Sequence, residues 1–196
     1  MGRPKEHGEE TRQRLLDSAA RILSEEGADA VSVRRLAQEV GTSTRAIYSL
    51  FGSKEGLLRA MFLRAADTFA RIHEAVPVRD DPLEELIPLG LAYRQSALEE
   101  PHLYGLLFGS QPGFHPTEED MRLAQRSQVR VVDTLERAAR LGQLHRDVRK
   151  IADEGWGLVH GLASLELMGC LGPPEAAEAV WRGALETMLA GLRQVG

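Results

Sequence analysis

The sequence predicts an all-α protein of about nine helices, with a small N-terminal head and a larger C-terminal body. Along most of the 196 residues, apolar side chains recur every three or four positions, as on one face of a helix. No clear run alternates between apolar and polar residues, as a half-buried strand would. Glycine and proline residues interrupt the helical pattern at points where helices commonly end or begin. These three observations favour a chain built from helices.

The first predicted helix runs from about Glu10 to Glu26, carries leucine and isoleucine on its core face, and ends at Gly27. The preceding Gly2-Arg3-Pro4-Lys5 is expected to be disordered without a partner. A short cationic arm of this kind could enter a DNA minor groove, although many such tails are only solvated. We favour the solvated tail.

The next two helices show the pattern of a helix-turn-helix: the first lies between Ser32 and Gly41, and the second begins after Ser43 and carries Ile47 and Leu50 or Phe51 on its inward face. Ser32 and Ser43 are placed to cap their starts, because a serine side chain accepts hydrogen bonds from the first free backbone N–H groups. Ala37 is small enough for a steep crossing, Gly41 suits a left-handed turn, and Ile47 supplies an aliphatic plug. In a helix-turn-helix the second helix lies in the DNA major groove. An ordinary helical hairpin would also satisfy this three-position pattern.

A fourth helix is predicted from Ser53 to about Ala75, linking the head to the body. Its free N–H groups and Lys54 could hold a phosphate. The segment from Val76 to Pro82 opposes helix continuation, since it contains two prolines and paired aspartates. We therefore expect a helix-turn-helix domain at residues 1–52, the linking helix at 53–75, and a ligand-binding and dimerisation domain at 76–196.

The body is predicted to contain five helices. The first reaches from Pro82 to about Glu99, and Pro101 suits the first turn of the next, which ends near Gly109. A loop rich in glycine and proline follows, and Thr117 then caps a long helix with acidic residues at its positive end. The remaining ranges, with their predicted ends, are 117–142, 147–171 and 174–192.

Composition bounds the class of protein. A chain of this length with 43% hydrophobic residues can bury one sizeable core, or one core and a small head. The net charge of −5 argues against a non-specific nucleic-acid coat, but residues 31–60 carry an excess of arginine and lysine over glutamate. A single cysteine, Cys170, excludes an intramolecular disulfide framework. With no apparent signal peptide or membrane span, we expect a soluble, cytoplasmic protein.

The stretch from Gly41 to Leu58 resembles the DNA-binding signature of the tetracycline-repressor (TetR) family. Its matching positions are Tyr48, Phe51, Gly52, Ser53, Lys54, Leu57 and Leu58. Leu50 departs from the pattern, because many members carry an aromatic residue or histidine there. The shorter spacing Trp156…His160-Gly161 resembles a C-terminal domain subtype of the same family. The resemblance implies a regulator, in our reading a repressor, that binds a palindromic DNA operator as a homodimer and responds to a small molecule.

Candidate DNA contacts cluster on the second and third helices and at the start of the fourth. Thr42, Thr44 and Arg45 face outward near the start of the recognition helix, and Arg45 could form two hydrogen bonds with a guanine. The resemblance places Tyr48 and Lys54 on phosphates and Ser49 near base edges. Arg34 and Arg35 begin the preceding helix and could contact the DNA backbone or form a solvated face.

The last two helices are candidates for a dimer interface, because each has a broad apolar face and Gly157 and Gly161 would allow backbones to approach closely. Two helices from each chain would then form a four-helix interface, as the resemblance also implies. The apolar stripes could instead face the chain's own core. The candidate interface residues are Leu158, Leu162, Trp181, Leu185, Met188 and Leu192.

A pocket for a small, largely apolar molecule is expected in the body, mostly from the resemblance. Aromatic residues with a few polar groups suit such a ligand, although the same residues are often plain core. The candidates are Phe69, Tyr93, Tyr104, Phe108, Met121, Trp156 and His160. Ligand binding would favour a dimer arrangement whose recognition helices miss the roughly 34–36 Å spacing of successive major grooves. The helix that begins at Ser53 would act as the lever.

No enzyme site, metal site or cofactor is expected. Cys170 and His160 would form the obvious dyad, but on one helix they would lie about 15 Å apart. The six histidines show no metal-ligand spacing, and no phosphate-binding glycine loop follows a strand. A helical protein-binding adaptor or ligand carrier without DNA readout is the alternative. It would leave the Tyr48 and Lys54 signature without a purpose.

Overall fold

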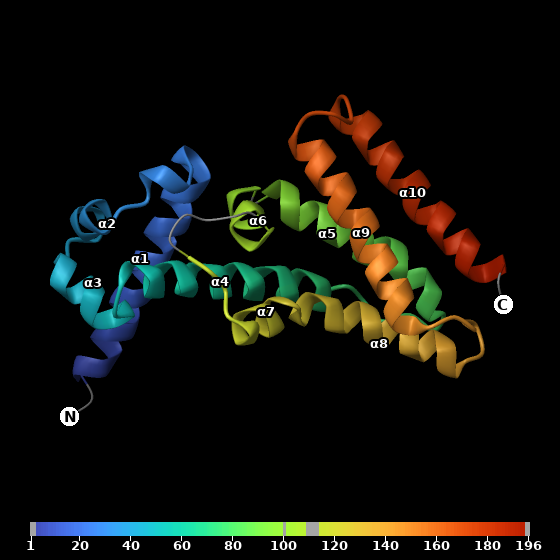
Figure 1. Cartoon of the computed structure of the whole chain (residues 1–196), viewed down its shortest axis with the longest axis horizontal. Helices are drawn as coiled ribbons and strands as arrows, with labels where there is room; N and C mark the ends of the chain where they lie inside the picture. Colours follow the sequence, from blue (N-terminus) through green and yellow to red (C-terminus); the bar gives the residue numbers. More distant parts are fainter. Residues whose placement is uncertain (1–2, 100, 109–113, 195–196) are drawn as a thin grey trace. The chain divides into compact units, whose positions relative to one another are not determined.

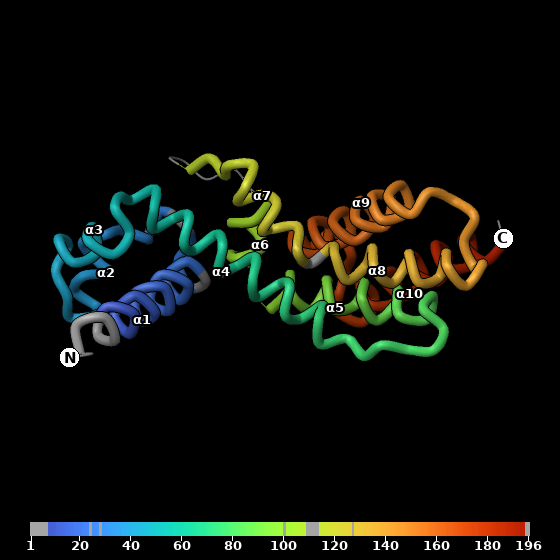
Figure 2. Tube along the Cα trace, turned by 90° about the horizontal axis from the view of Figure 1, so that it is seen from below, coloured from blue at the N-terminus to red at the C-terminus, as the bar shows by residue number. Residues whose placement is uncertain are grey.

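The computed structural model describes residues 3–99, 101–108 and 114–194. Across these ranges the secondary structure consists of ten α-helices and two short 3-10 helices, with no strand, so the predicted all-α class is confirmed. Packing divides the chain into two compact units, whose elements are drawn in Figures 1 and 2. Unit 1 contains residues 1–66 and 100–124, and unit 2 contains residues 67–99 and 125–196. Packing units need not coincide with functional domains, so the domain boundaries stay a prediction.

Unit 1 begins with α1 (Arg3–Glu26), a helix that starts earlier than the sequence predicted. Arg3–Lys5, expected to be a disordered arm, instead forms its first turn, and Gly2 lies outside the described residues. Proline is tolerated in a first helical turn, because its missing N–H has no partner there. The charged composition that suggested a tail is therefore compatible with helix.

The helix-turn-helix is formed by α2 (Val33–Val40) and α3 (Thr44–Phe51), as predicted. The Ser32 side chain accepts a hydrogen bond from the backbone N–H of Arg35, and Ser43 accepts one from Ala46. Gly41 has a φ of 70°, the left-handed conformation that glycine adopts without steric cost. Leu36, Ala37, Val40 and Ile47 are buried, which fixes the crossing of the two helices.

The core of unit 1 also includes α1, the 3-10 helix η1 (Ala28–Ala30) and the first part of α4 (Lys54–Glu74), as far as Ala66. Helix α6 (Pro101–Phe108) belongs to the same unit and packs on α1. Its fully buried side chains include Leu15, Ile22, Leu36, Ile47, Leu57 and Phe62. The ring of Phe62 lies 5.5 Å from that of Phe114. Before α7 (Glu118–Ala124), Thr117 and Asp120 cap each other reciprocally, and Arg59 donates to the buried Asp120 carboxylate at 2.7 Å.

Unit 2 contains the rest of α4, the 3-10 helix η2 (Pro82–Glu85), α5 (Leu86–Glu99), α8 (Arg126–Arg140), α9 (Val148–Leu167) and α10 (Pro174–Gln194). The helix predicted from Pro82 thus begins as a 3-10 turn capped by Asp81. Helices α9 and α10 lie side by side and antiparallel after a short turn, and both contact α5 (Figure 1). One core cluster joins Leu83, Leu135, Ala138, Leu144, Ile151, Ala152, Leu189 and Leu192.

The long helix predicted at residues 117–142 is two helices, and this accounts for ten helices in place of nine. Gln125 separates α7 from α8, with its carbonyl accepting from the N–H of Gln128 three residues on. A bond between residues three apart closes a tighter turn than the α-helix allows. Neither glycine nor proline stands between Ala124 and Ser127, so the sequence offered no signal for this break.

The helix predicted to end at Leu171 ends at Leu167. Gly169 has a φ of 74°, and the N–H of Cys170 donates to the carbonyl of Leu165. This arrangement is the Schellman motif, which terminates a helix at a left-handed glycine. The two prolines after Gly172 favoured the later end in the sequence, but the earlier Gly169 is the residue that ends the helix.

Glu85 holds η2 against α8 inside unit 2. It has no exposed surface, and it accepts hydrogen bonds from the backbone N–H of Arg79, from Arg130, from Arg137 and from Thr134. Burial alone would raise the pKa of Glu85, but these hydrogen bonds outweigh it and lower the pKa to about 2. The carboxylate is therefore ionised and fully paired.

Candidate functional site

The exposed face of α3 presents the residues that the sequence predicted as DNA contacts. Thr44, Arg45, Tyr48 and Ser49 are exposed, whereas Ile47 between them has no exposed surface. These positions share one side of the helix because residues four apart lie one above the other. Tyr48 has 48% of its surface exposed, which is high for an aromatic residue and shows that its side chain is not part of the core. Thr42, in the turn, is half-buried.

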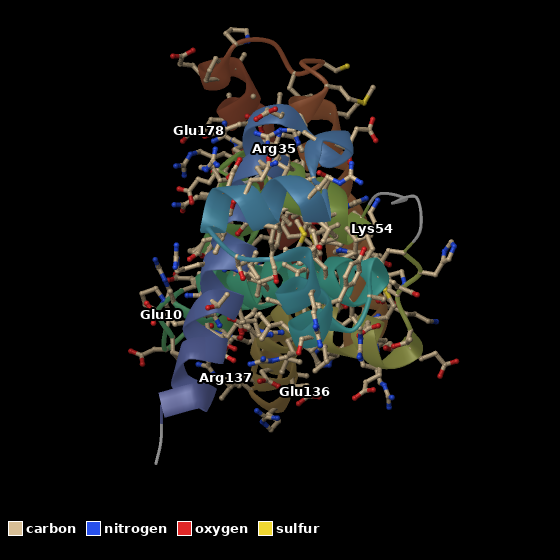
Figure 3. The ribbon with its side chains drawn as sticks, turned by 90° about the vertical axis from the view of Figure 1, so that its left-hand side faces the viewer. Glu10, Arg35, Lys54, Glu136, Arg137 and Glu178 are labelled. Carbon is tan, nitrogen blue, oxygen red and sulfur yellow. The ribbon has the colours of Figure 1, made fainter. Side chains whose placement is uncertain are left out.

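Three of the cationic side chains predicted to contact DNA have no ion-pair partner among the described residues of unit 1. Arg34, Arg45 and Lys54 are exposed, and none of them forms a hydrogen bond or ion pair with the part of the chain that the structure describes. A cation without an intramolecular partner can neutralise a phosphate without first breaking a contact. Figure 3 labels Lys54, at the start of α4.

Arg35, which is also labelled in Figure 3, is by contrast paired within unit 1. Its guanidinium donates to Glu26 at 2.7 Å and to Glu39 at 3.2 Å, and Glu39 also pairs with Arg21. The hydrogen bonds from Arg35 lower the pKa of Glu26, chiefly by favouring its charged form. Arg34 and Arg35 look alike in the sequence, but in the part of the chain that the structure describes Arg34 is a free cation whereas Arg35 links α1 to α2.

The turn between α3 and α4 brings Lys54 next to the recognition helix. Gly52 has a φ of 77°, and the Ser53 side chain caps α4 by accepting from the N–H of Gly56 at 3.0 Å. A Cβ at Gly56 would lie 1.9 Å from the carbonyl oxygen of Phe51, so only glycine fits there. Gly52 was part of the sequence signature, whereas the requirement for glycine at position 56 is visible only in the structure.

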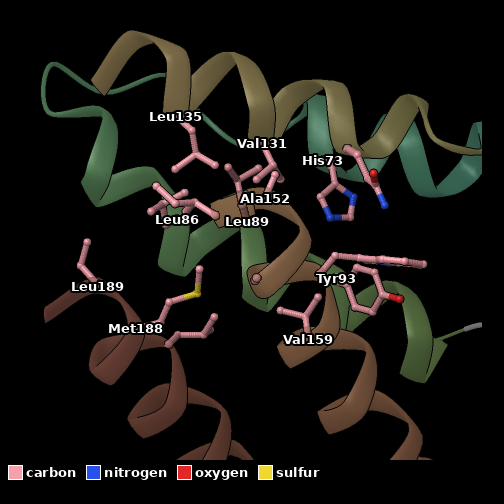
Figure 4. A pocket seen from close by; sticks show the side chains of 16 residues that line it. His73, Leu86, Leu89, Tyr93, Val131, Leu135, Ala152, Val159, Met188 and Leu189 are labelled. Carbon is pink, nitrogen blue, oxygen red and sulfur yellow. The ribbon is translucent and has the colours of Figure 1, made fainter. Parts of the chain in front are cut away.

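Unit 2 contains an apolar cavity between α4, α5, α8, α9 and α10 (Figure 4). It has about 670 Å³ of space between its walls, part of which is open to solvent. The residues around it that are aliphatic or sulfur-containing are Leu86, Leu89, Val131, Leu135, Ile151, Ala152, Val159, Leu185, Met188 and Leu189. The part of this space that water-sized molecules can occupy is about 70 Å³. It is the apolar lining of the cavity that is typical of sites for small apolar molecules.

Only a few polar side chains interrupt these walls. His73 and Gln128 line the cavity, and neither was singled out from the sequence. The ring of Tyr93 also lines it, and the Tyr93 hydroxyl lies 3.2 Å from Nδ1 of His160. Burial lowers the pKa of both His73 and His160 below 6.5, because the charged imidazolium is poorly solvated there. The position of His73, one turn after Phe69 on an apolar helix face, was the available signal.

The predicted ligand-binding residues fall into two groups. Tyr93 and Trp156 line the cavity. Two others contact those residues, since the Phe69 ring lies 5.8 Å from Tyr93 and the His160 ring 5.8 Å from Trp156. The rest, Tyr104, Phe108 and Met121, belong to unit 1, where Tyr104 and Phe108 pack on each other. The structure therefore brings four of the seven together around one cavity.

Most of the predicted dimer residues pack inside unit 2. Leu162, Trp181, Leu185 and Leu192 are buried there, and Leu158 and Met188 are half-buried. The stripe on α10 faces α5, because a glycine at position 90 lets the two helices approach closely. A Cβ at Gly90 would lie 2.5 Å from Leu185. For these four residues the structure matches the alternative interpretation, in which the stripe faces the chain's own core.

A different face of α9 and α10 is exposed and carries small or apolar residues. Leu165 and Val180 are each 43% exposed, and Met168, at the end of α9, is 73% exposed. A Cβ at Gly157, Gly161 or Gly183 would meet nothing within 4 Å. We call this set, Gly157, Gly161, Leu165, Met168, Val180 and Gly183, the outer face of α9 and α10.

The structure does not place the candidate dyad on one helix, and no metal-binding cluster occurs in the described ranges. Cys170 lies beyond the end of α9, so the helix predicted to carry both Cys170 and His160 carries only the histidine. Histidine, cysteine, aspartate and glutamate side chains form no group of three that could hold a metal there. Likewise, no helix in the described ranges combines the length and apolarity needed to cross a membrane.

Comparison with known families matches both parts of the chain. Residues 15–61 match the family of bacterial regulatory proteins of the tetR type, and residues 86–188 match the tetracyclin repressor-like C-terminal domain. The HTH-type transcriptional regulator Rv1816 of Mycobacterium tuberculosis is 28% identical over 120 residues. The match covers 59% of this chain, which spans about half the length of that relative, at 51%. The repressor KstR2 of the same species is 29% identical over 199 residues, 94% of each chain.

Solved structures share the fold across nearly the whole chain. A Rhodococcus protein of unknown function is 29% identical, with a TM-score of 0.78 over 93% of this chain and 95% of its own. The Bacillus subtilis transcriptional regulator FadR, solved in complex with stearoyl-CoA, has a TM-score of 0.75 at 17% identity. It covers 91% of this chain and 98% of its own, and at this identity the likeness concerns the fold alone.

Proposed function

The chain belongs to the TetR family of transcriptional regulators, which are not enzymes, and on that premise we propose that it is a ligand-responsive repressor. In this proposal a homodimer binds a palindromic DNA operator and is released by a small, largely apolar molecule. The observation that carries the proposal is the exposed α3 face, where Arg45 and the nearby Lys54 have no partner within the described chain. Its relationship to the repressor KstR2 supports the assignment of repression.

Direct readout of the operator is assigned to the start of α3. Arg45 would donate two hydrogen bonds to a guanine, which discriminates against a wrong base by about 1–3 kcal/mol. Thr44 and Ser49 lie on the same exposed face and would contact neighbouring base edges. Tyr48, Lys54 and Arg34 would bind phosphates, which position the helix without reading sequence. Arg35 is assigned a structural role, since Glu26 and Glu39 already hold it.

Dimerisation is assigned to the outer face of α9 and α10. A single recognition helix offers few side chains to base edges, so specific binding benefits from two copies on one two-fold axis. Small residues such as Gly157 and Gly161 let helix backbones approach closely, and the exposed Leu165 and Val180 supply apolar area. In a two-fold dimer the same surface patch of each subunit meets its copy, so the outer face of one chain would pack on the outer face of the other.

Control by a small molecule is assigned to the cavity of unit 2. The fold is able to hold an elongated acyl ligand, since its B. subtilis relative by structure was solved with stearoyl-CoA. An effector that binds one dimer arrangement more tightly shifts the population towards that arrangement. If the favoured arrangement no longer presents two recognition helices at the spacing of successive major grooves, the operator is released.

The test is selection of bound sequences from a random duplex pool, followed by affinity measurements on the selected operator. Arg45→Ala should relax the base preference at one position of each half-site, because only that contact reads a base. Lys54→Ala should weaken all duplexes about equally and reduce the slope of affinity against salt by about 1. Lys150→Ala removes an exposed lysine from unit 2 and should leave both measurements unchanged.

The two substitutions have different expected effects: Arg45→Ala changes the base preference, whereas Lys54→Ala changes the affinity for every duplex. If wild type and Arg45→Ala both bind the selected and scrambled duplexes with equal affinity, specific readout is refuted. Binding that is insensitive to salt would point instead to the class of helical adaptor or ligand carrier, because neutralising phosphates releases counterions.

A further inference from the structure

His73 presents an unused hydrogen-bond acceptor to the cavity. Its side chain is 3% exposed and lines the wall contributed by α4 (Figure 4). Nδ1 lies 2.9 Å from the carbonyl oxygen of Phe69. A carbonyl oxygen can only accept, so Nδ1 carries the proton and donates it. In the neutral ring the other nitrogen, Nε2, is then an acceptor, and no hydrogen bond to it forms within the described part of the chain.

The ring is neutral at physiological pH. Burial lowers the pKa of His73 below its ordinary 6.5, and the hydrogen bond to Phe69 only partly opposes that shift. No carboxylate pairs with the ring among the described residues, so nothing nearby stabilises an imidazolium. Nε2 is therefore held as an acceptor rather than as a cationic donor.

The rest of the wall carries no charge. Besides His73, the polar side chains that line the cavity are those of Tyr93, Gln128 and Trp156, and among the residues that the structure describes no lysine, arginine, aspartate or glutamate lines it. An ionised ligand group would lose its hydration here without gaining a partner, which disfavours its binding. The geometry selects for ligands that are uncharged where they are enclosed.

We propose that the cavity binds an uncharged, mainly hydrocarbon alcohol or phenol, whose O–H donates a hydrogen bond to Nε2 of His73. The inference rests on the proposed function only in taking this cavity as the effector site. A hydroxyl is favoured over a ketone or ether because those groups cannot donate, and a ligand that displaces solvent from Nε2 without donating to it leaves that acceptor unpaired. The amide of Gln128, on α8, is the second polar group that such a hydroxyl can meet, as a donor to its oxygen.

The test uses a matched set of probes that share one apolar frame and differ in a single group. The set is 2-naphthol, 2-methoxynaphthalene, naphthalene and 2-naphthoate. Isothermal titration calorimetry on the DNA-free protein should show 2-naphthol binding about tenfold more tightly than 2-methoxynaphthalene, the value of one hydrogen bond. It should also show 2-naphthoate binding most weakly, because its carboxylate has no cation to meet.

His73→Phe should abolish the preference for 2-naphthol over 2-methoxynaphthalene while both still bind. The matched control is His145→Phe, since His145 is exposed and lies outside the cavity, and it should keep the preference. A purely structural role for His73 would change affinity for both probes alike. Nitrogen-15 spectra of the histidine rings supply a reading from wild type that needs no variant. Nε2 of His73 should be unprotonated and should shift with 2-naphthol but not with 2-methoxynaphthalene.

Three results would overturn the inference. The first is equal affinity of wild type for 2-naphthol and 2-methoxynaphthalene, the second is tightest binding of 2-naphthoate, and the third is the absence of binding by any of the four probes. All three are measured without DNA. The proposed function fails by a different measurement, loss of sequence preference among duplexes, so the two failures are distinguishable.

Discussion

Glu85 and Arg45 are both charged, and their surroundings give them opposite roles. Glu85 is enclosed, and each of its oxygens accepts hydrogen bonds from the backbone or from arginine side chains. Arg45 is exposed and has no partner within the described chain. A fully paired buried charge stabilises the fold through its contacts, whereas an unpaired surface cation is available to a partner molecule.

The pairing of Glu85 predicts how stability depends on pH. Its pKa is about 2 in the folded chain, below the ordinary value near 4.5. A lowered pKa in the folded state contributes stability above the unfolded value, and this contribution is lost as pH falls from about 4.5 to about 2. The loss should amount to about 3 kcal/mol, given about 1.4 kcal/mol for each pKa unit. Denaturant unfolding at several pH values between 6 and 2 measures it.

Glu85→Gln should flatten that pH dependence and should lower stability at neutral pH by about 3–5 kcal/mol, because Arg130 and Arg137 lose their common partner. Glu136→Gln is the matched control, since its carboxylate is half exposed and, within the described part of the chain, pairs only with Arg140 one turn away. A Glu85→Gln variant whose stability falls with pH as steeply as the wild type would contradict the assignment.

Sequence alone could not assign every residue, since the neighbours of a side chain depend on the fold. Arg34 and Arg35 are identical side chains at adjacent positions, yet only Arg35 faces Glu26, nine residues earlier, and Glu39. The role of His73 could not be predicted from the sequence either, because it depends on the residues that form the cavity and on the hydrogen bond to the carbonyl of Phe69. The outward residues of α3 were predictable, since they follow from helical spacing around the buried Ile47.

At the scale of elements, the turn from α3 to α4 depends on glycine at two points. Gly52 adopts a positive φ, and Gly56 leaves room for the carbonyl of Phe51. Gly56→Ala should therefore destabilise the chain by about 1–3 kcal/mol or more, the usual cost of forcing extra atoms into a packed site. Since the turn positions Lys54, DNA affinity should fall as well. Thermal unfolding and duplex binding are the two measurements.

Gly105→Ala provides the comparison, because Gly105 lies inside α6 and a Cβ there would meet nothing within 4 Å. Alanine favours helix over glycine by about 1 kcal/mol, so this substitution should be neutral or stabilising. If the two substitutions had equal effects, crowding at Phe51 would not be the reason for the glycine at position 56.

Elements were predictable where a capping residue or a glycine signals an end. Ser32, Gly41 and Ser43 mark the limits of α2 and α3, and the structure confirms them. The break at Gln125 has no such signal, because it arises from the local hydrogen-bond pattern and not from a helix-breaking residue. The sequence also could not show whether the apolar stripe of α10 faces the chain's own core or a second subunit. Periodicity shows that a face is apolar, but not which neighbour covers it.

At the scale of the whole molecule, the outer face of α9 and α10 predicts a dimer that a single charge can disrupt. Leu165→Arg should shift the chain from dimer to monomer and weaken operator binding, because a charge at the centre of an apolar contact loses its hydration. Sedimentation over a range of protein concentrations measures the dissociation constant, which should rise by at least tenfold, about 1.4 kcal/mol.

Leu141→Arg places the same charge on a leucine that is 63% exposed at the end of α8, and it should leave the dimer intact. A monomeric wild type, or equal behaviour of the two variants, would move the interface elsewhere. The sequence indicated this pair of helices as candidates, but the residues it selected lie mostly on their buried side. Burial of Trp181 within the chain depends on α5, which is distant in sequence.

Helix α10 contributes residues to two different surfaces, the cavity wall and the outer face. Leu185, Met188 and Leu189 form part of the cavity wall, whereas Val180 and Gly183 belong to the outer face. If both surfaces are used as proposed, effector and second subunit are bound to opposite sides of one rod, a single helix apart. Thermodynamic reciprocity then applies: whatever factor the effector imposes on subunit affinity, subunit association must impose on effector affinity. Dilution of the protein alone would then change the apparent potency of its inducer.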